Sequence, residues 1–537
     1  MTAPSQRFIR SVQLIIVLTF LYQLSLLFRG DEAFLSRPFL EDSFYALSVA
    51  RSISDGTGFS VDGIHPTNGV QPLVCLLDAP LFALSGGDDA LALRLVYLLN
   101  IGFYLFAAWM IAGFMRGLYR DEEKKPIVFW SVFGLIYANY VVGLHYLNGL
   151  ETALAGGLVF AALWYQVRMW DAAQPGLRNW GVLGVLLGLA VLARIDLAIL
   201  VVAVVAMRFV RAHLLYSGLP GPERWGRFVQ TVKEVVLMGG IAVLVSSPWW
   251  AYNYLTFGSL MPISGQSQQW LLQDAFRSVV ETFNVLSDSL LPGVQTPVGM
   301  RIGLWAPYGI VLVPLLLVAL AMLPGVRDGV RRLRGRFPAE WDWKAFLPFA
   351  LFCLILIGFY TFFFRASHFQ SRYLILPRIA VLLCLFAALY TLWGQLGKNL
   401  LARRLLIPVL FVPMLLHFAF FARNFEDGYA NFMVYAVQWI DGHVEPEQTV
   451  GMFQSGTTGF VYPDHVVNLD GKVNSEALHA FQRGELPQYV DSAKFDYIID
   501  WDLYTARAFS DPEVRRAYHP VDTLVHDMIV WERRETP

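Results

Sequence analysis

The chain has 537 residues, of which 56% are hydrophobic, 15% aromatic and only 15% charged. This composition is typical of a polytopic membrane protein. The formal net charge of −1 gives no positive field that would attract nucleic acid, so nucleic acid is excluded as a partner. The three cysteines do not form a disulfide framework, because Cys353 and Cys384 fall inside apolar runs and Cys75 stands alone.

The first apolar run follows Arg7 and Arg10, as a signal peptide would. No small-residue cleavage site follows it and many similar runs come later, which favours a retained helix. Eleven apolar runs in all approach the length that crosses about 30 Å of hydrocarbon. They are residues 12–28, 90–114, 127–147, 153–167, 180–193, 195–210, 235–255, 302–323, 345–364, 373–393 and 405–421.

Lys and Arg are concentrated in alternate loops of this arrangement. The basic loops are the N-terminus and residues 116–125, 168–178, 208–233, 327–344 and 398–404. Eleven spans place all of them in the cytoplasm, as the positive-inside rule requires. The run at 72–84 is too short to span and contains Asp78 and Pro80, so we interpret it as an interfacial or re-entrant helix.

The expected architecture is a polytopic α-helical membrane protein of about 11 transmembrane helices, followed by a soluble α/β domain. The membrane domain takes residues 1–422, with a first outer loop at 29–89 and an outer segment at 258–300. Residues 423–537 then lie outside the cytoplasm. Their pattern predicts strands at 449–453, in VVNLDG, at 497–500 and at 526–531, with a helical stretch at 475–492. The segment GMFQSGTTG is interpreted as a strand-to-helix turn.

The unusual polar residues converge on the outer face in this topology. The most prominent are the adjacent carboxylates Glu41 and Asp42, at the start of a predicted helix in the first outer loop. Acidic side chains suit a helix N-terminus, which accounts for one of the two. Ionisable groups kept at a membrane surface more often serve chemistry than stability, so we expect a reaction site on the outer face.

Three segments carry a resemblance to a known family. Residues 42–73 match DxFY followed by ARxIxxGxGFxxDGxxPTNGxQPL, residues 148–154 are NGLETAL and residues 466–474 are VVNLDGKVN. Over nearly its whole length the chain resembles the GT-C glycosyltransferases, which take sugars from polyprenyl-phosphate donors. It is similar to a bacterial branch whose architecture resembles the protein O-mannosyltransferases, the lipid A aminoarabinose transferases and the mycobacterial arabinofuranosyltransferases.

The resemblance implies that an acid of the first outer loop is the general base for the acceptor hydroxyl. Asp42 matches this role best, with Glu41 in reserve. A leaving lipid phosphate needs positive charge, and Arg365 and Arg372 are the first candidates, with His368 between them and Arg194 second. Candidates for binding the acceptor or the sugar are His65, Asn68, Gln71, Glu151, Asn468 and Asp470.

Several of these residues have a structural alternative. Arg372 is also placed as an interfacial anchor, Arg194 can simply pair with Asp196, and Glu151 opens a helix, where an acid is favourable. His65 and His145 lack a close ligand spacing such as HxxxH, so no metal ligands are assigned. No cofactor is certain, and a divalent cation stays open because some members of the superfamily use one.

The function expected from the sequence is an inverting glycosyltransferase of the bacterial inner membrane, working on its periplasmic face. Its partners would be a polyprenyl-phosphate-linked sugar donor, the membrane lipid and a glycan, lipid or protein acceptor. The alternatives are a transporter or flippase for a lipid-linked glycan, and a non-catalytic component of glycan assembly. A transporter predicts ionisable residues in the middle of spans and on both faces.

Overall fold

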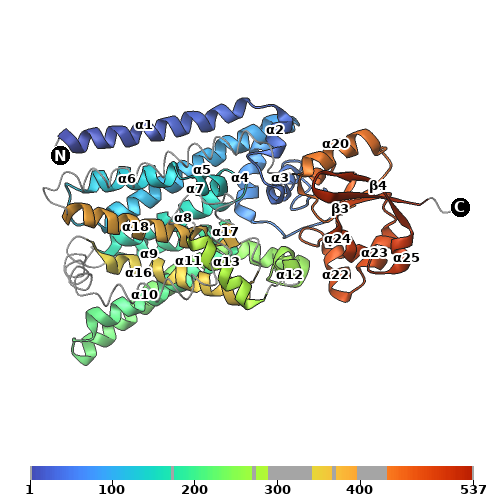
Figure 1. The fold of residues 1–537 in the computed structure, drawn as a ribbon. Helices are drawn as coiled ribbons and strands as arrows, with labels where there is room; N and C mark the ends of the chain where they lie inside the picture. The colour runs from blue at the N-terminus through green and yellow to red at the C-terminus, as the bar shows by residue number, and fades with distance from the viewer. Residues whose placement is uncertain are drawn as a thin grey trace.

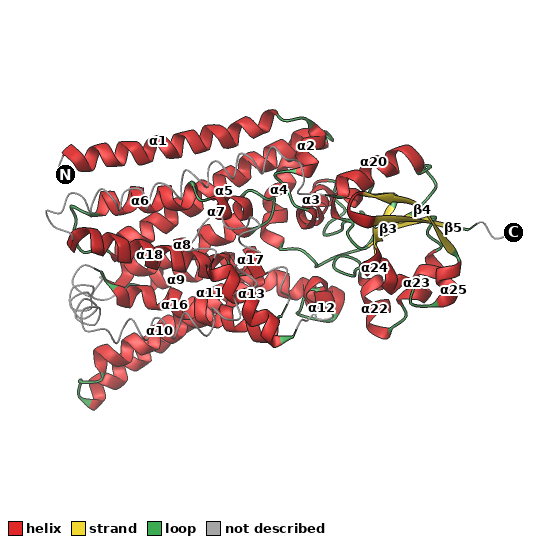
Figure 2. Ribbon diagram, in the orientation of Figure 1, coloured by secondary structure: helices red, strands yellow, loops and turns green. Residues whose placement is uncertain are grey.

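The computed structural model describes residues 3–170, 175–268, 274–287, 341–365, 370–395 and 432–534. These residues form a long bundle of helices with a small α/β domain at one end (Figure 1). Within the described residues, the strands all belong to that small domain (Figure 2). The described helices of the bundle and its loops are α1 (Ala3–Ser25), η1 (Leu26–Phe28), α2 (Asp31–Ser36), α3 (Glu41–Ser54), α4 (Pro72–Ser85), α5 (Asp89–Leu118), α6 (Lys125–Tyr137), α7 (Tyr140–Tyr146), α8 (Thr152–Trp170), α9 (Leu177–Ala193), η2 (Ile195–Leu197), α10 (Ala198–Tyr216), α11 (Gly221–Phe257), α12 (Ile263–Gln268), α13 (Ala275–Ser287), α16 (Trp343–Gly358), the π-helix η4 (Phe359–Phe363), α17 (Gln370–Tyr373) and α18 (Ile375–Gln395).

Four helical segments in the described part of the chain are long and apolar enough to cross a membrane. They are Gln6–Phe28, Asp89–Leu118, Gly221–Phe257 and Trp343–Phe363. A fifth span results if α6 and α7, which meet at a bend of 66°, are counted together. The chain is therefore a multi-pass membrane protein, as its composition predicts.

The described helices do not establish the predicted count of eleven spans. Two of the predicted spans, 302–323 and 405–421, lie outside the described residues. The run at 127–147 is broken into two helices by the bend between α6 and α7. The run at 235–255 forms only the second part of α11, because the basic segment before it continues the same helix. The run at 72–84 forms the short helix α4.

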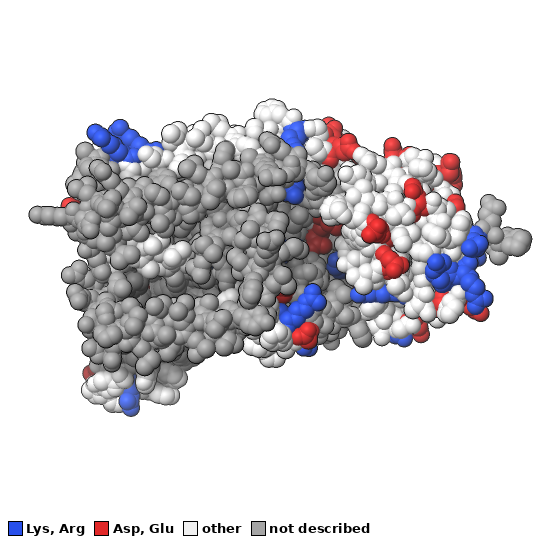
Figure 3. Space-filling model, viewed as in Figure 1, with Lys and Arg blue, Asp and Glu red and all other residues white. Residues whose placement is uncertain are grey.

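The charge distribution fits a bundle that lies in lipid. Figure 3 shows basic side chains at the end of the flank along which Figure 1 draws α1, then uncharged surface, then charged groups near the C-terminal domain. No Lys, Arg, Asp or Glu occurs in α1 after Arg10. Because charge is costly in hydrocarbon, this flank is suited to contact the membrane.

Glycines allow α9 and α11 to pack closely. A Cβ atom on Gly184 would lie 2.6 Å from the carbonyl oxygen of Met238. A Cβ on Gly188 would lie 2.8 Å from the carbonyl oxygen of Ala242. Small residues at such positions let helix backbones approach in membranes, where van der Waals packing drives association.

The C-terminal domain is built on a five-stranded sheet of order β2-β1-β3-β5-β4. β1, β2 and β3 are mutually parallel, and β5 and β4 continue the sheet in antiparallel pairing. Its elements are α20 (Met433–His443), β1 (Val450–Met452), α21 (Gly456–Val461), β2 (Val466–Asn468), α22 (Ser475–Arg483), α23 (Leu486–Ala493), β3 (Tyr497–Trp501), α24 (Asp502–Ala508), α25 (Pro512–Arg516), β4 (Tyr518–Leu524), η6 (Val525–Asp527) and β5 (Met528–Arg533).

Alternate residues of β3 serve two separate cores, since successive side chains of a strand point to opposite faces. Ile499 packs with α20 on one face, and Ile498 packs with α23, α24 and α25 on the other. The predicted α/β domain is confirmed, with two differences. The stretch at 475–492 is two helices because Gly484 takes a left-handed conformation between them, and β4 was not predicted.

We expect Gly188→Val to destabilise the bundle, because its side chain must enter the contact with α11. Overpacking of this kind costs about 1–3 kcal/mol. The melting temperature of the purified protein in detergent measures the effect. Gly239→Val is the matched control, since a Cβ at Gly239 meets nothing within 4 Å. Equal melting temperatures of the two variants would contradict the proposed packing.

Candidate active site

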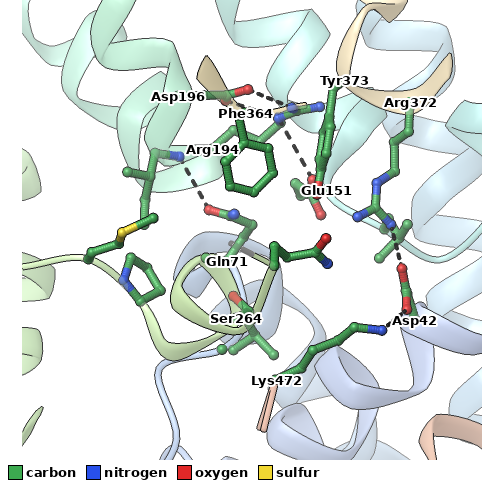
Figure 4. Close-up of a pocket in the computed structure, with 18 of the residues that line it drawn as sticks. Asp42, Gln71, Glu151, Arg194, Asp196, Ser264, Phe364, Arg372, Tyr373 and Lys472 are labelled. Carbon is green, nitrogen blue, oxygen red and sulfur yellow. Dashed lines mark hydrogen bonds and ion pairs between the residues drawn. The ribbon is translucent and has the colours of Figure 1, made fainter. Parts of the chain in front are cut away.

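A cavity of about 430 Å³ lies where the helical bundle meets the C-terminal domain. Its lining comes from segments far apart in the sequence, namely the first loop with α3, the loop before α8, the turn between α9 and η2, α11 with the loop that follows it, α12, η4, α17 and the loop after β2. Figure 4 shows the side chains of Asp42, Arg372 and Lys472 converging on one side, and Arg194 with Asp196 and Glu151 on the other.

The helix that carries the acidic pair is fixed at its start by a neighbouring loop. The backbone N–H of Leu40 donates to the carbonyl of Asn148 at 3.2 Å. Gly149 has a φ of +80°, and a Cβ there would lie 2.5 Å from the ring of Phe39. Only glycine suits such a left-handed, crowded position. The NGLETAL segment thus sets where α3 begins, and with it the direction of both carboxylates.

Asp42 points into the cavity between two cations. Arg372 donates from Nη1 to its Oδ2 at 3.0 Å, and the Nζ of Lys472 lies 3.7 Å from its Oδ1. The two cations reach Asp42 from opposite sides, one from α17 and one from the C-terminal domain (Figure 4). The Asp42 side chain is 21% exposed, so it remains open to a ligand in the cavity.

Lys472 is buried, and a second carboxylate holds it in place. Its Nζ lies 3.0 Å from Oδ2 of Asp470, and its backbone N–H donates to Oδ1 of the same residue at 2.8 Å. Burial alone would lower the pKa of Lys472, but Asp470 and Asp42 raise it well above its ordinary value. Lys472 therefore carries a positive charge beside Asp42.

Glu41 faces away from the cavity, toward the first turn of α21. It accepts hydrogen bonds from the backbone N–H of Gly456 and from the backbone N–H of Thr457, the latter at 3.1 Å, and from the Thr457 hydroxyl. A Cβ on Gly456 would lie 2.2 Å from the carbonyl oxygen of Glu41. Burial raises the pKa of Glu41 to about 7. The predicted strand-to-helix turn in GMFQSGTTG is confirmed, and it is the docking point for α3.

Arg194 also lines the cavity, but it is held by acids. Its guanidinium donates to both oxygens of Asp196, from Nε at 3.1 Å and from Nη2 at 2.6 Å. Glu151 lies 3.9 Å from its Nε. The hydroxyl of Tyr360 donates to Asp196 at 2.6 Å. The alternative in which Arg194 pairs with Asp196 is thus what the structure contains.

Tyr360 belongs to the π-helix η4, which directly follows α16. Its ring stacks on Tyr373 with centroids 4.6 Å apart, and Tyr373 lies beside both Arg194 and Arg372. π-helical turns are rare and occur often at functional sites. Here the wide turn brings Tyr360 and Phe359 to the wall of the cavity.

The remaining walls differ in polarity. One is apolar and includes residues whose side chains are also exposed at the surface, Leu260 at 55%, Met261 at 37% and Phe359 at 38%. The other carries hydrogen-bonding side chains, among them Gln71, Ser264 and Gln268. The cavity can therefore receive a ligand with an apolar part and a hydroxylated part.

Gln71 and Glu151 are the predicted acceptor residues that line the cavity, together with the predicted Asp42, Arg194 and Arg372. Asp470 is not a lining residue of the cavity, but its carboxylate contacts Lys472, which is. Gln71 also accepts a hydrogen bond from the backbone N–H of Ile195 at 3.3 Å.

Other predicted site residues lie elsewhere. Asn68 is buried and accepts from the N–H of Ile263 at 2.9 Å, so it holds the start of α12. Asn468 donates to the Ser455 hydroxyl at 2.9 Å and accepts from the N–H of Gly471 at 3.1 Å, which fixes the loop before Lys472.

His65 pairs with Asp62 at 2.7 Å and is half exposed, outside the cavity. Arg365 is not among the lining residues, although its neighbour Phe364 is. His368 lies outside the described residues.

Four residues that line the cavity were not predicted from the sequence, namely Lys472, Tyr360, Ser264 and Gln268. Lys472 stands inside the motif VVNLDGKVN, and a lysine directly after two polar site candidates was a signal that could have identified it. Tyr360 gave no signal, because it is one aromatic residue in an apolar run. Ser264 and Gln268 occur in a polar stretch whose fold was not predicted.

The residues around Asp42 do not fit a metal ion. A divalent cation needs several oxygen ligands, whereas Asp42 faces a guanidinium and an ammonium group. Nowhere in the described ranges do three His, Cys, Asp or Glu side chains gather as metal ligands would.

A family described as Domain of unknown function (DUF8728) matches residues 423–536. No curated protein matches the sequence. The structure is similar to the crystal structure of ArnT from Cupriavidus metallidurans bound to undecaprenyl phosphate, with a TM-score of 0.52 and 14% identity over 96% of this chain and 97% of that chain. ArnT in the apo state gives a TM-score of 0.51 at 14% identity over the same shares.

The chain has the GT-C membrane fold. A lower similarity, with a TM-score of 0.48 and 13% identity, links it to the Archaeoglobus fulgidus oligosaccharyltransferase over 97% of this chain and 73% of that chain. That score is too low to support an inference. The GT-C fold that the motifs predicted is confirmed over nearly the whole length.

The stability of this protein is expected to depend on pH through Glu41. The folded pKa of about 7 lies above the ordinary value of 4.5, so at intermediate pH the folded chain binds a proton that the unfolded chain does not. The contribution of Glu41 to stability is then fully present below pH 4.5 and is lost as the pH rises through 7. We expect the melting temperature in detergent to fall over this range, and Glu41→Gln to weaken the slope.

Glu445→Gln, at an exposed acid of the C-terminal domain, is the control and should keep the slope of the native protein. An identical pH dependence in the Glu41→Gln variant would exclude Glu41 as its source.

Proposed function

We propose that this protein is an integral-membrane glycosyltransferase that moves a sugar from a polyprenyl-phosphate donor to a hydroxyl acceptor. The acceptor belongs to a glycan, a lipid or a protein, and transfer takes place on the periplasmic face of the bacterial inner membrane. The observation that carries this proposal is the carboxylate of Asp42, which faces the cavity between Arg372 and Lys472. A base and phosphate-binding cations are thereby in the same small space.

In the proposed reaction the acceptor hydroxyl attacks the sugar C1 while the bond from C1 to the phosphate oxygen breaks. The hydroxyl proton passes to Asp42, and the polyprenyl phosphate leaves with the electron pair of the broken bond. A single displacement inverts the configuration at C1. A positioned carboxylate base contributes roughly 100-fold to 10,000-fold, and fixed cations stabilise the charge that develops on the phosphate.

Arg372 is the best-placed cation for the leaving phosphate among the predicted ones. It lies in the cavity 3.0 Å from Asp42, whereas two acids already hold Arg194. The exposed apolar wall formed by Leu260, Met261 and Phe359 supports entry of the lipid tail from the bilayer. Gln71, Ser264 and Gln268 supply the hydrogen-bonding groups that a sugar requires.

Asp42→Asn should abolish transfer, because an amide cannot accept the proton. We expect a loss of about 100-fold or more, with normal expression and an unchanged elution profile of the purified protein. The assay measures release of undecaprenyl phosphate from a panel of undecaprenyl-phosphate-linked mannose, galactose and arabinose. Asp55→Asn, at an exposed acid that ends the same helix, is the matched control.

Transfer by the Asp42→Asn variant at the native rate would remove Asp42 from the mechanism. Such a result would favour the alternative of a transporter or of a glycan-binding assembly component, neither of which needs a base.

Arg372→Ala should mainly weaken use of the donor. Hydrogen bonds to charged groups contribute about 1.5–3 kcal/mol, so kcat/KM for the donor should fall about tenfold or more. Arg372→Lys keeps the charge but loses the paired donors of the guanidinium, and should give an intermediate value. The initial rate as a function of donor concentration measures the effect. An unchanged dependence on donor concentration in the Arg372→Ala variant would contradict the role in phosphate binding.

A further inference from the structure

The loop that follows β2 places a residue of the C-terminal domain beside Asp42 in the cavity. Asn468 and Asp470 fix this loop, and Lys472 extends from it to within 3.7 Å of Asp42. Residues 423–536, which include Lys472, match a family for which no function is described. The contact therefore gives this domain a specific place in the site.

The approach of the Lys472 loop depends on Gly69 in the first loop. A Cβ on Gly69 would lie 1.9 Å from the carbonyl oxygen of Lys472 and 3.2 Å from the side chain of Val473. Any side chain at position 69 must push the two loops apart. Val473 packs with Tyr45 and Val70 in a small apolar cluster that closes the contact.

The helix that carries Asp42 makes further contacts with the same domain on both sides of that residue. Glu41 precedes Asp42 and accepts hydrogen bonds from the first turn of α21. Tyr45 lies one turn later, and its hydroxyl accepts from the N–H of Ser455 at 3.2 Å. Residues of α3 on both sides of Asp42 contact the C-terminal domain. The position of Asp42 is therefore tied to that of Lys472, which belongs to the same domain.

We propose that Lys472 is a positioning residue that keeps Asp42 ionised, and that it does so only while the C-terminal domain is docked on α3. The proposal rests on the proposed role of Asp42 as the base. A carboxylate accepts a proton from an acceptor hydroxyl only when it is ionised beforehand, and an opposite charge within about 4–6 Å favours that form. The high pKa of Lys472 supports a positive charge at this position.

Other charges face Asp42 and act in known directions. Arg372 of α17 favours the ionised form, whereas the carboxylates of Glu41, Glu151 and Asp470 oppose it. Asp470 is itself in contact with Lys472 at 3.0 Å. Loss of Lys472 would remove one positive charge from beside Asp42 while the hydrogen bond from Arg372 and the nearby carboxylate of Asp470 stay in place.

The test measures the ionisation of Asp42 directly and without substrate. The O–H of a protonated carboxyl adds across one C=N bond of dicyclohexylcarbodiimide to give an O-acylisourea, which rearranges by an O-to-N acyl shift to a stable N-acylurea. Mass spectrometry with fragmentation of the peptide quantifies the product at Asp42 separately from that at Glu41. The pH of half-maximal labelling reports the proton affinity of Asp42. We expect Lys472→Met to raise this pH by about one unit, and Lys472→Arg to leave it close to the native value.

Gly69→Ala tests the dependence on docking, because it changes no charge. We expect it to reproduce the upward shift of Lys472→Met. The matched controls are Lys494→Met, which removes an exposed lysine of the same domain, and Gly30→Ala, where a Cβ meets nothing within 4 Å. Both controls should label as the native protein does.

A labelling midpoint in Lys472→Met within about 0.2 pH unit of the native one would overturn the proposal, since this difference is much smaller than the expected shift of about one unit. A shift in Lys472→Met without one in Gly69→Ala would overturn the dependence on docking. Where transfer is detected, the acidic limb of its pH profile should move with the midpoint in Lys472→Met. An equal loss of rate at every pH would indicate only structural damage and would contradict the proposal.

Failure of the proposed function is recognised separately. In that case Asp42→Asn retains transfer, or the native chain releases no undecaprenyl phosphate from the donor panel, whereas the labelling result is unaffected.

Discussion

The contact between the start of α3 and the C-terminal domain determines how the site is built. Glu41 accepts hydrogen bonds from the first turn of α21, and the next residue, Asp42, faces the cavity. Successive side chains of a helix point in directions about 100° apart, so two adjacent acids cannot share one role at the start of α3. Glu41 joins α3 to the C-terminal domain, and this contact positions Asp42 in the cavity.

The same contact explains why the cavity has balanced charge. Three cations and three carboxylates are among its lining residues, namely Asp42, Glu151, Arg194, Asp196, Arg372 and Lys472. Arg194 is held by Asp196 and Glu151, which leaves Asp42 shared between Arg372 and Lys472. An incoming phosphate competes with Asp42 for Arg372, and with Asp42 and Asp470 for Lys472, so it meets both cations beside the proposed base.

Much of the fold could be predicted from the spacing of apolar residues along the sequence. Apolar runs predict spanning helices, because the hydrocarbon thickness fixes their length. Alternating apolar residues predicted the C-terminal strands except β4, whose middle residues from Pro520 to Thr523 are exposed and carry no apolar alternation. The bend between α6 and α7 was missed because the apolar run at 127–147 continues across it.

The site was predictable only in part, because a residue type does not specify a contact. The predicted topology placed the acidic pair and Arg372 on the same face of the membrane. Asn68 and Asn468 were predicted to bind the acceptor or the sugar, but in the structure they hold loops by hydrogen bonds. Both are polar residues in turns, where binding backbone groups is their ordinary role. Lys472 was missed since the sequence gives no distance between the first loop and a segment some 400 residues later.

The parallel part of the C-terminal sheet has an arrangement known from ligand-binding α/β proteins. Open α/β sheets bind their ligands in the crevice beyond the carboxyl ends of the strands, often with an anion at a helix N-terminus. In this domain the carboxyl ends of β1 and β2 lead to α21 and to the Lys472 loop, and both contact α3. The C-terminal domain thus receives the acidic end of α3 at the edge where open α/β sheets bind their ligands.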